Sequence, residues 1–403
     1  MTRDGAGTLA MNRGILQSQQ ALDLRGLGLR SLRLEMIPIH IRKPPLIGAS
    51  RFCCLATLLL LTVGSRSPSS KSLSDPIPSH GIEALIQAFE KSPLVALGES
   101  HQLQEIHDFI TVLIRHPAFP DEANDIVVEW GNALYQDILD RYISGEKVSL
   151  SEIRQVWRNT TAGPLGPWDA PVYEHFFTTV RLVNEKLAPS RRLRVLAGDP
   201  PIDWTQVNGP DEVQSFLRQR DTHFATVVEK EVLAKGRKAL LIMGSGHLFR
   251  NRRYHDLEPV NTNVQKLIER SHPGEMFVVM LHVGFSDKDA SLEQRLASWP
   301  RPSLALLRGT WLGALEPASF LSQRRVNRII HDAYPGMRLQ DLADAYLYLG
   351  PRDSLTRSRP SPNLYRKDQA YLRELMRRRE LEVGMPLDLK SFLEEKPKKY
   401  FND

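Results

Sequence analysis

Apolar runs of three to six residues recur along the chain, and most of them end at a glycine or a charged residue. Between them lie stretches in which apolar residues recur every three or four positions, the spacing of amphipathic helices. We expect buried strands at these positions: 94–97, 126–128, 193–197, 239–243, 276–281 and 345–349. This alternation predicts a three-layer α/β domain, with a mostly parallel central sheet and helices on both of its faces.

The helical pattern is clearest around the first expected strand. Ile82, Leu85, Ile86 and Phe89 share one helical face, and Ser79 precedes them as an expected N-terminal cap. A second helix follows this strand, and the next strand begins about 30 residues after the first. This separation is that of a βαβ unit, so the two strands should be parallel.

Longer connections interrupt this simple alternation. Residues 132–190 exceed a plain crossover and predict a helical insertion, whereas residues 286–343 show no clear pattern. Residues 351–403 predict a charged helical extension. Within it the basic cluster 377–379 is interpreted as a solvated helix face because glutamates flank it, with a nucleic-acid or membrane patch as the alternative.

The first 65 residues differ in composition from the rest. The uncharged apolar run 52–63 is shorter than the roughly 20 residues needed to span a bilayer, and it lies between basic and small polar residues. This order is typical of a secretory signal peptide, although a buried strand or helix is the alternative. We therefore expect an exported protein, periplasmic or secreted, that meets a membrane only during export.

These observations give a domain division along the chain. Residues 1–35 are interpreted as a disordered leader or an over-called start, with Met36 as the better start, and 36–65 as the signal peptide. A linker is expected at 66–78 and the α/β domain at 79–350.

Composition describes a soluble globular protein, with 41% apolar and 25% charged residues in 403. The formal charge is +6, but the first 64 residues hold eight basic and three acidic side chains, which leaves +1 for the remainder. A nucleic-acid-binding protein would keep a basic excess in its folded part, so we expect no nucleic-acid partner. Both cysteines, Cys53 and Cys54, precede the expected domain, which therefore has no disulfide and no thiolate ligand to offer.

Polar residues that can carry chemistry follow four of the expected strands. They are Glu99 and His101, Glu129, Asp199, and His247. In a parallel sheet the carboxyl ends of the strands share one edge, where ligands bind. Glu129 follows three apolar residues and should be buried, so it needs a partner, and the two histidines are the candidates. Asp199 precedes two prolines and is interpreted as a supporting residue or as a turn residue.

Two catalytic chemistries fit these residues. In the first, His101, His247 and one or both of Glu99 and Glu129 hold a divalent metal, Zn²⁺ or Mn²⁺, that activates a water molecule. In the second, no metal is needed: one histidine takes a proton from water, and Glu99 or Glu129 fixes its tautomer. A third reading is an inert scaffold in which these residues are paired only structurally.

Other polar residues near these motifs are not favoured as catalytic groups. Ser100 and Ser245 lack the Gly-x-Ser-x-Gly context of a nucleophile elbow. His107 lies next to the apolar stripe of its helix and is interpreted as a helix-packing residue.

The motif Leu97-Gly98-Glu99-Ser100-His101 resembles the opening motif of the ChaN-like haem-binding proteins, and residues 244–247 (Gly-Ser-Gly-His) resemble their second motif. The paired Gly-x-x-His pattern is also similar to the Tiki/TraB proteins, some of which are metal-dependent proteases. The acidic first motif is similar to the erythromycin esterase-like hydrolases.

The resemblance implies two classes of function. A ChaN-like protein would capture haem or iron, and Trp130, Trp168 and Tyr173 could then offer a flat face to the ring, or else pack in the core. The paired carboxylates favour a hydrolase of an ester, lactone or amide, acting on a small-molecule or peptide substrate, because hydrolysis uses them directly. The alternative is a haem-binding uptake protein without catalytic activity.

Overall fold

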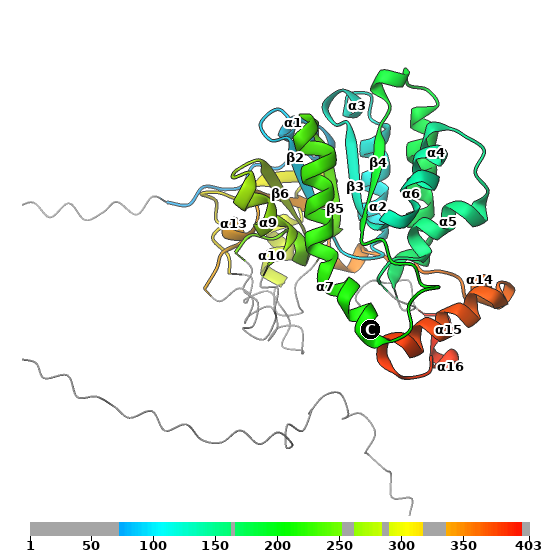
Figure 1. The fold of residues 1–403 in the computed structure, drawn as a ribbon. Coiled ribbons are helices and arrows are strands. Elements are labelled where there is room, and N and C mark those ends of the chain that lie inside the picture. Colours follow the sequence, from blue (N-terminus) through cyan, green and yellow to red (C-terminus); the bar gives the residue numbers. More distant parts are fainter. Residues whose placement is uncertain (1–71, 163–165, 252–261, 284–289, 317–335, 397–403) are drawn as a thin grey trace, which may run out of the picture. The chain divides into compact units, whose positions relative to one another are not determined.

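One mixed sheet of eight strands runs through the part of the chain that the computed structural model describes, residues 72–162, 166–251, 262–283, 290–316 and 336–396 (Figure 1). Its strand order is β1-β7-β8-β6-β2-β5-β3-β4. The strands are β1 (Ser79–His80), β2 (Leu94–Glu99), β3 (Asp125–Asn132), β4 (Arg194–Asp199), β5 (Ala239–Gly244), β6 (Met276–Leu281), β7 (Ser303–Leu306) and β8 (Ala345–Tyr348).

The strands from β8 to β4 are parallel, and β1 and β7 add an antiparallel edge. The α/β class with a mostly parallel sheet is therefore confirmed. Each expected strand overlaps an observed one, whereas β1 and β7 were not expected. β7 has four residues and ends at Leu306, which is 60% exposed, so it lacks the continuous apolar pattern of a buried strand.

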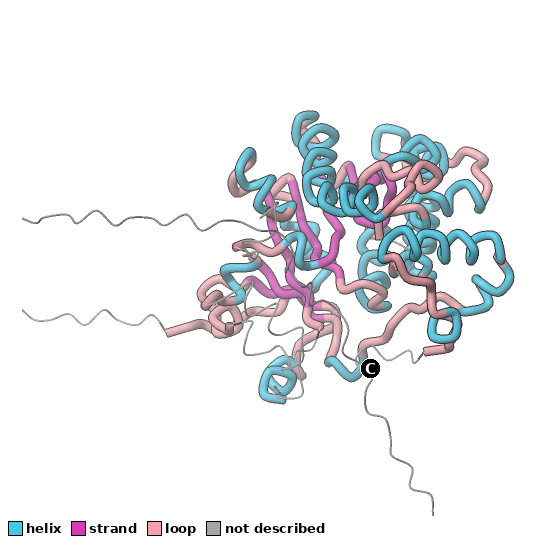
Figure 2. The backbone as a smooth tube through the Cα atoms, turned by 60° about the horizontal axis from the view of Figure 1, so that its bottom comes forward, coloured by secondary structure: helices cyan, strands magenta, loops and turns pink. Residues whose placement is uncertain are grey.

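Helices cover both faces of the sheet (Figures 1 and 2). Their bounds are α1 (Gly81–Ala88), α2 (Gln104–Arg115), α3 (Phe119–Glu122), α4 (Gln136–Ser144), α5 (Leu150–Arg158), α6 (Pro171–Asn184), α7 (Pro210–Val227), α8 (Ser245–Leu248), α9 (Val264–Ser271), α10 (Ala290–Leu296), α13 (Leu339–Leu342), α14 (Pro362–Lys367), α15 (Gln369–Val383) and α16 (Leu389–Phe392).

The apolar side chains of the strands divide between two cores. Val95 and Leu97 of β2 pack with α1 to α6, whereas Leu94 and Ala96 pack with α7 to α10 and α13. This division follows from the pleat of a strand, because successive side chains point to opposite faces. Both faces are buried, which explains why the strands read as continuous apolar runs.

The expected cap of the first helix is wrong. Ser79 belongs to β1, where it pairs with Leu304 of β7, and α1 begins two residues later at Gly81. His80 holds the N-cap position without a side-chain cap hydrogen bond. The residue that the helical pattern alone assigned to the cap thus belongs to the unexpected edge strand β1, which pairs with β7.

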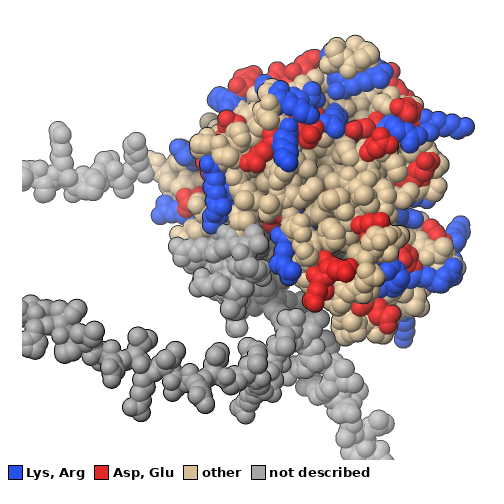
Figure 3. All heavy atoms as spheres, in the orientation of Figure 1, with Lys and Arg blue, Asp and Glu red and all other residues tan. Residues whose placement is uncertain are grey.

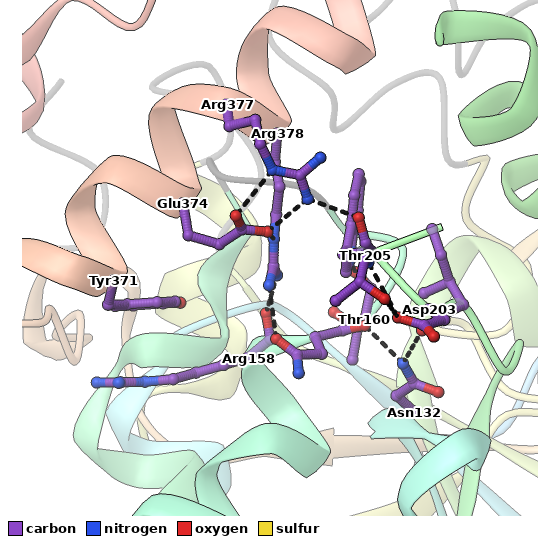
Figure 4. A network of polar contacts seen from close by, with 12 residues as sticks. Asn132, Arg158, Thr160, Asp203, Thr205, Tyr371, Glu374, Arg377 and Arg378 are labelled. Atoms are coloured by element: carbon purple, nitrogen blue, oxygen red, sulfur yellow. Dashed lines mark hydrogen bonds and ion pairs between the residues drawn. The ribbon is translucent and has the colours of Figure 1, made fainter. Parts of the chain in front are cut away.

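The C-terminal helices join the body through a buried arginine (Figure 4). Arg378 of α15 donates to the carbonyl of Arg158, at 2.9 Å, and to Oδ1 of Asn159, at 2.7 Å. Its guanidinium carbon lies 5.0 Å from the ring centroid of Trp204, and only 6% of the side chain is exposed. The interpretation of 377–379 as a solvated face is therefore wrong for Arg378, which fastens α15 to the end of α5 instead.

Charges of both signs are interspersed on the face shown in Figure 3. In the ranges described above, no helix is long and apolar enough to cross a membrane. The expected leader, the signal peptide with both cysteines, and the start of the linker lie outside the described residues.

Candidate functional site

The order of the central strands brings the strand-end residues together. β5 lies between β2 and β3, so Glu99 of β2 is in register with Gly244 of β5, and the end of β3 lies on the other side of β5. His101 follows β2 by two residues, and His247 lies in the short helix α8 directly after β5. Both histidines line one cavity of about 550 Å³.

A bulge at the end of β3 aims Glu129. Three residues, 129–131, lie opposite the single residue Gly198 of β4, because Val128 pairs with Ala197 and Asn132 with Asp199. Gly131 fits this bulge because a Cβ there would lie 2.8 Å from Cα of Ala197. The irregularity directs the Glu129 side chain toward β5 and α7.

Glu99 is a fully buried carboxylate with three donors. Its Oε1 accepts from the Tyr173 hydroxyl at 2.7 Å and lies 2.9 Å from Nε2 of His107, and its Oε2 lies 3.4 Å from Nδ1 of His101. Burial raises the pKa of Glu99, but the hydrogen bonds and charges of His101 and His107 outweigh it and hold this pKa below its usual range. His107 is buried in α2, as a packing residue should be, and it also contacts Glu99.

His101 lies at the mouth of the site. Its ring meets Trp168 edge to face, with centroids 4.8 Å apart, and a Cβ on Gly244 would lie 3.1 Å from its Cε1. The glycine therefore lets the imidazole approach β5. Burial lowers the pKa of His101, but the negative charges of Glu129 and Glu99 raise it to about 9.

Glu129 is 2% exposed and contacts two residues of the cavity lining, Gly244 and His247. Its Oε2 accepts the Gly244 N–H at 2.7 Å, and its Oε1 pairs with the Arg220 guanidinium and lies 3.9 Å from Nε2 of His247. Burial raises the pKa of Glu129, but the charges of Arg220, His101 and His247 outweigh this effect and hold the pKa below its usual value. The carboxyl group is therefore ionised. The expected contact between Glu129 and a histidine is thus accompanied by an arginine that was not expected.

His247 has a partner that the sequence reading missed. Its Nδ1 lies 2.6 Å from Oδ1 of Asp221, the residue after Arg220 in α7. Because Nδ1 is held by a carboxylate, Nε2 is the atom directed toward Glu129. The helix that follows β4 therefore supplies one contact to Glu129 and one to His247.

Asp199 lies outside the cavity lining and is linked to Glu129 through Arg220. It accepts from the Thr161 hydroxyl at 2.6 Å and from the Thr161 N–H at 2.7 Å, and it lies 3.6 Å from Nε of Arg220. Burial raises the pKa of Asp199 to about 7, against the opposing effects of Arg220 and Thr161. Asp199 does not line the cavity of the two histidines, and its link to the site is the shared Arg220.

The proposed metal ligands lie close together, but their arrangement does not fit a metal ion. Arg220 already places a positive charge on Oε1 of Glu129, and Oε2 of that residue accepts a backbone N–H. Both oxygens of Glu99 are also engaged. In the described ranges, no group of three or more His, Cys, Asp or Glu side chains is placed to hold a metal ion.

The aromatic residues considered for haem lie in the packed interior. Trp130 and Tyr173 are fully buried, and Trp168 is 3% exposed. They contact one another with ring centroids 4.9 to 6.1 Å apart. The three rings therefore pack in the core between β3 and the insertion, as the second of their two interpretations expected. They offer no open face to a macrocycle.

Comparison with known proteins shows the fold. No family model matches the chain, and no curated protein matches it in sequence. Among solved structures, a succinoglycan biosynthesis protein has a TM-score of 0.50 at 9% identity, over 72% of this chain and 96% of that chain.

Two further structures match less closely. A mutant of erythromycin esterase EreC in its open conformation has a TM-score of 0.46 at 14% identity, over 67% of this chain and 93% of that one. The ChaN protein of Campylobacter jejuni, with cofacial haem bound, has a TM-score of 0.33 at 17% identity, over 51% and 87%. At 9% identity this likeness shows the fold alone: the expected α/β fold is shared with the succinoglycan biosynthesis protein.

Proposed function

We propose that this protein hydrolyses an ester, lactone or amide of a small molecule or peptide, with His247 as general base and His101 as general acid. One observation carries the proposal: two histidines line one cavity, and each has its Nδ1 against a carboxylate, Glu99 for His101 and Asp221 for His247. Such pairing fixes the tautomer of each imidazole and presents Nε2 for proton transfer.

The electrostatics of the site divide the two roles. With a pKa of about 9, His101 carries a proton at neutral pH and is suited to donate it, not to accept one. The base is then His247, whose imidazolium form would be stabilised by Asp221 on one side and by Glu129, at 3.9 Å, on the other.

The reaction balances with water as the only co-reactant. Nε2 of His247 takes a proton from the water molecule while the water oxygen bonds to the carbonyl carbon of the substrate. The oxyanion that develops on the carbonyl oxygen accepts a hydrogen bond from the His101 imidazolium. When the tetrahedral intermediate collapses, the bond to the leaving group breaks and His101 protonates the departing oxygen or nitrogen. Transfer of the proton from His247 back to His101, directly or through water, restores the starting state.

A panel of esters, lactones and amides tests this function, with a matched histidine as control. We expect His247→Asn and His101→Asn each to lower kcat by about 100-fold or more, because general acid–base catalysis contributes about 10²- to 10⁴-fold. His175→Asn, on the exposed side of α6, should leave turnover unchanged. Equal turnover in all three variants would contradict the proposal.

The alternative is a haem-binding uptake protein of the ChaN-like type without catalytic activity. Purification without added ligand, followed by elemental analysis and an absorption spectrum, separates the readings. A Soret band with stoichiometric iron supports the haem alternative. A stoichiometric transition metal without that band supports metal-assisted hydrolysis and would require Arg220 to leave Glu129. Neither signal, together with hydrolysis that depends on the histidines, supports the metal-free mechanism.

Export is a separate proposal, supported by the basic, apolar and small polar order around residues 52–63. We propose that the mature chain begins within residues 64–75, outside the cytoplasm. N-terminal sequencing of the protein from the producing cell tests this. Detection of an intact 52–63 segment in a cytoplasmic fraction would contradict it.

A further inference from the structure

The hydroxyl of Tyr173, in the helical insertion, contacts both the carboxylate partner of His101 and the backbone of the residue that follows His101. It donates to Oε1 of Glu99 at 2.7 Å, and it accepts the backbone N–H of Gln102 at 3.0 Å. Glu99 is the carboxylate against Nδ1 of His101, and Gln102 is the next residue in the chain. One buried hydroxyl therefore fixes the partner of this imidazole and the backbone that carries it.

The backbone at Gln102 needs this support. Its φ of 66° lies in the left-handed region, which is costly for a residue other than glycine and persists where surrounding contacts hold it. Besides the Tyr173 hydroxyl, its side chain donates to the carbonyl of Pro167 at 3.2 Å, and its own carbonyl accepts the Ser358 N–H at 2.7 Å. Backbone strain of this kind clusters at functional sites, and here it lies directly after His101, the proposed acid.

We infer that Tyr173 is a positioning residue for His101, through its hydroxyl bridge between Glu99 and the Gln102 backbone. This inference rests on the proposed function for its catalytic meaning, but the bridge itself can be tested without turnover. Burial, followed by the charge of Glu99, raises the pKa of Tyr173 well above its ordinary value, so the hydroxyl stays protonated and remains a donor.

The hydroxyl also competes with His101 for the charge of Glu99. A donor at 2.7 Å draws negative charge toward Oε1 and away from Oε2, which faces the imidazole. Removing it leaves more of the carboxylate charge to act on His101. Glu129 and Arg220 also act on this ring, and His107 shares Oε1 of Glu99 with the hydroxyl. His247 and Arg357 line the same cavity, and a change at Tyr173 replaces none of these residues.

The test is an NMR titration of the His101 imidazole in the full chain, compared with its kinetics. Tyr173→Phe keeps the ring packed against Trp130 and Trp168 but removes the bridge. We expect the pKa of His101 to rise by about half a unit, the Gln102 amide to lose protection from hydrogen exchange, and kcat to fall about tenfold with KM within twofold.

Two further proteins sharpen the test. Tyr142→Phe, which removes a half-buried hydroxyl elsewhere in the insertion, is the control and should leave the His101 titration unchanged. Replacement of Tyr173 by 3-fluorotyrosine keeps the shape and makes the hydroxyl a stronger donor, so it should lower the pKa of His101 and remain folded even if Tyr173→Phe does not.

The outcomes separate the two ideas. An unchanged His101 titration in both Tyr173 variants overturns the positioning role. A shifted titration in a protein that turns over no ester, lactone or amide supports the bridge and defeats the proposed hydrolase instead.

Discussion

Asp221 lies 2.6 Å from Nδ1 of His247, and its neighbour in α7, Arg220, pairs with the carboxylate of Glu129, which lies 3.9 Å from Nε2 of the same imidazole. Adjacent residues of one helix therefore control both the orientation of the proposed base and the charge of the group next to it. The site consequently depends on the packing of α7 against the ends of β3 and β5 as much as on the strand-end residues themselves.

Asp221→Asn should damage catalysis more than folding. The amide cannot fix the Nδ1–H tautomer of His247 or stabilise its imidazolium, so we expect kcat to fall by about 100-fold or more. Steady-state kinetics measure this loss, and a urea titration checks that the fold is retained. Asp211→Asn, the same change at an exposed position of α7, is the control and should leave kcat within twofold. Equal kinetics for both variants would remove Asp221 from the mechanism.

The rate should fall as the pH rises through about 9. His101 has its pKa raised to about 9, and its role as acid needs the protonated form, so deprotonation removes the proton donor. A profile of kcat against pH between 6 and 10 measures this limb. Substitution of His101 by Asn should leave a low rate without the limb. A basic limb that persists in this variant would assign it to another group.

Stability should also decline with rising pH, for a related reason. A histidine whose folded pKa lies above its ordinary 6.5 contributes stability that is fully present below pH 6.5 and is lost as the pH passes its folded value of about 9. Asp199, with a folded pKa of about 7 against 3.8, loses its contribution earlier. Urea unfolding at pH 7, 8 and 9 should show a falling free energy of unfolding, with a smaller slope in His101→Asn. A wild-type free energy that stays constant or rises over this range would contradict the raised pKa of His101.

The strand-end residues could be predicted because two local rules combine there. A short apolar run that stops at glycine marks the end of a buried strand, and parallel strands place such ends at one edge. Glu99 lies in β2 and Glu129 in β3, the two neighbours of β5, and His247 follows β5 in α8. The sequence could not supply the strand order that puts β5 between β2 and β3, because that order depends on contacts between distant segments.

The residues of α7 were missed although the chain carries a signal for them. In α7, Leu217 is partly buried and Phe224 is buried, and Asp221 lies on the same face, four residues after the first and three before the second. A charged residue that interrupts an apolar stripe needs a partner, and here the partner is His247. The rest of the helix is rich in charge, so the interruption resembled an ordinary solvated position.

Substitutions at Gln102 should separate backbone strain from side-chain contacts. Glycine adopts a φ of 66° without cost, so Gln102→Gly should stay within about 0.5 kcal/mol of the parent, losing mainly the hydrogen bond to Pro167. Gln102→Val places a β-branched residue in the left-handed region and should cost about 2 kcal/mol, with a loss of turnover. Urea midpoints and kcat measure both. Equal stability of the two variants would mean that this backbone conformation is not maintained in solution.

Removal of Arg220 should lower the free energy of unfolding, because its guanidinium is the positive charge next to two buried carboxylates. Glu129 and Asp199 are each 2% exposed, and both contact this guanidinium. Arg220→Met leaves their charges uncompensated, which should cost about 3 kcal/mol at pH 8, since breaking a buried pair by removing one partner is strongly destabilising. At pH 5.5 the loss should be smaller, because Asp199 can take up a proton and remove one of the two charges.

Urea unfolding at both pH values tests this, with Arg218→Met, an exposed arginine of the same helix, as the control. The pH dependence is the decisive part of the measurement. A general weakening of α7 would lower stability equally at pH 5.5 and pH 8, whereas uncompensated carboxylates must lower it more at the higher pH. A loss that is independent of pH, or equal to that of Arg218→Met, would show that Arg220 does not hold the two acids in their ionised forms.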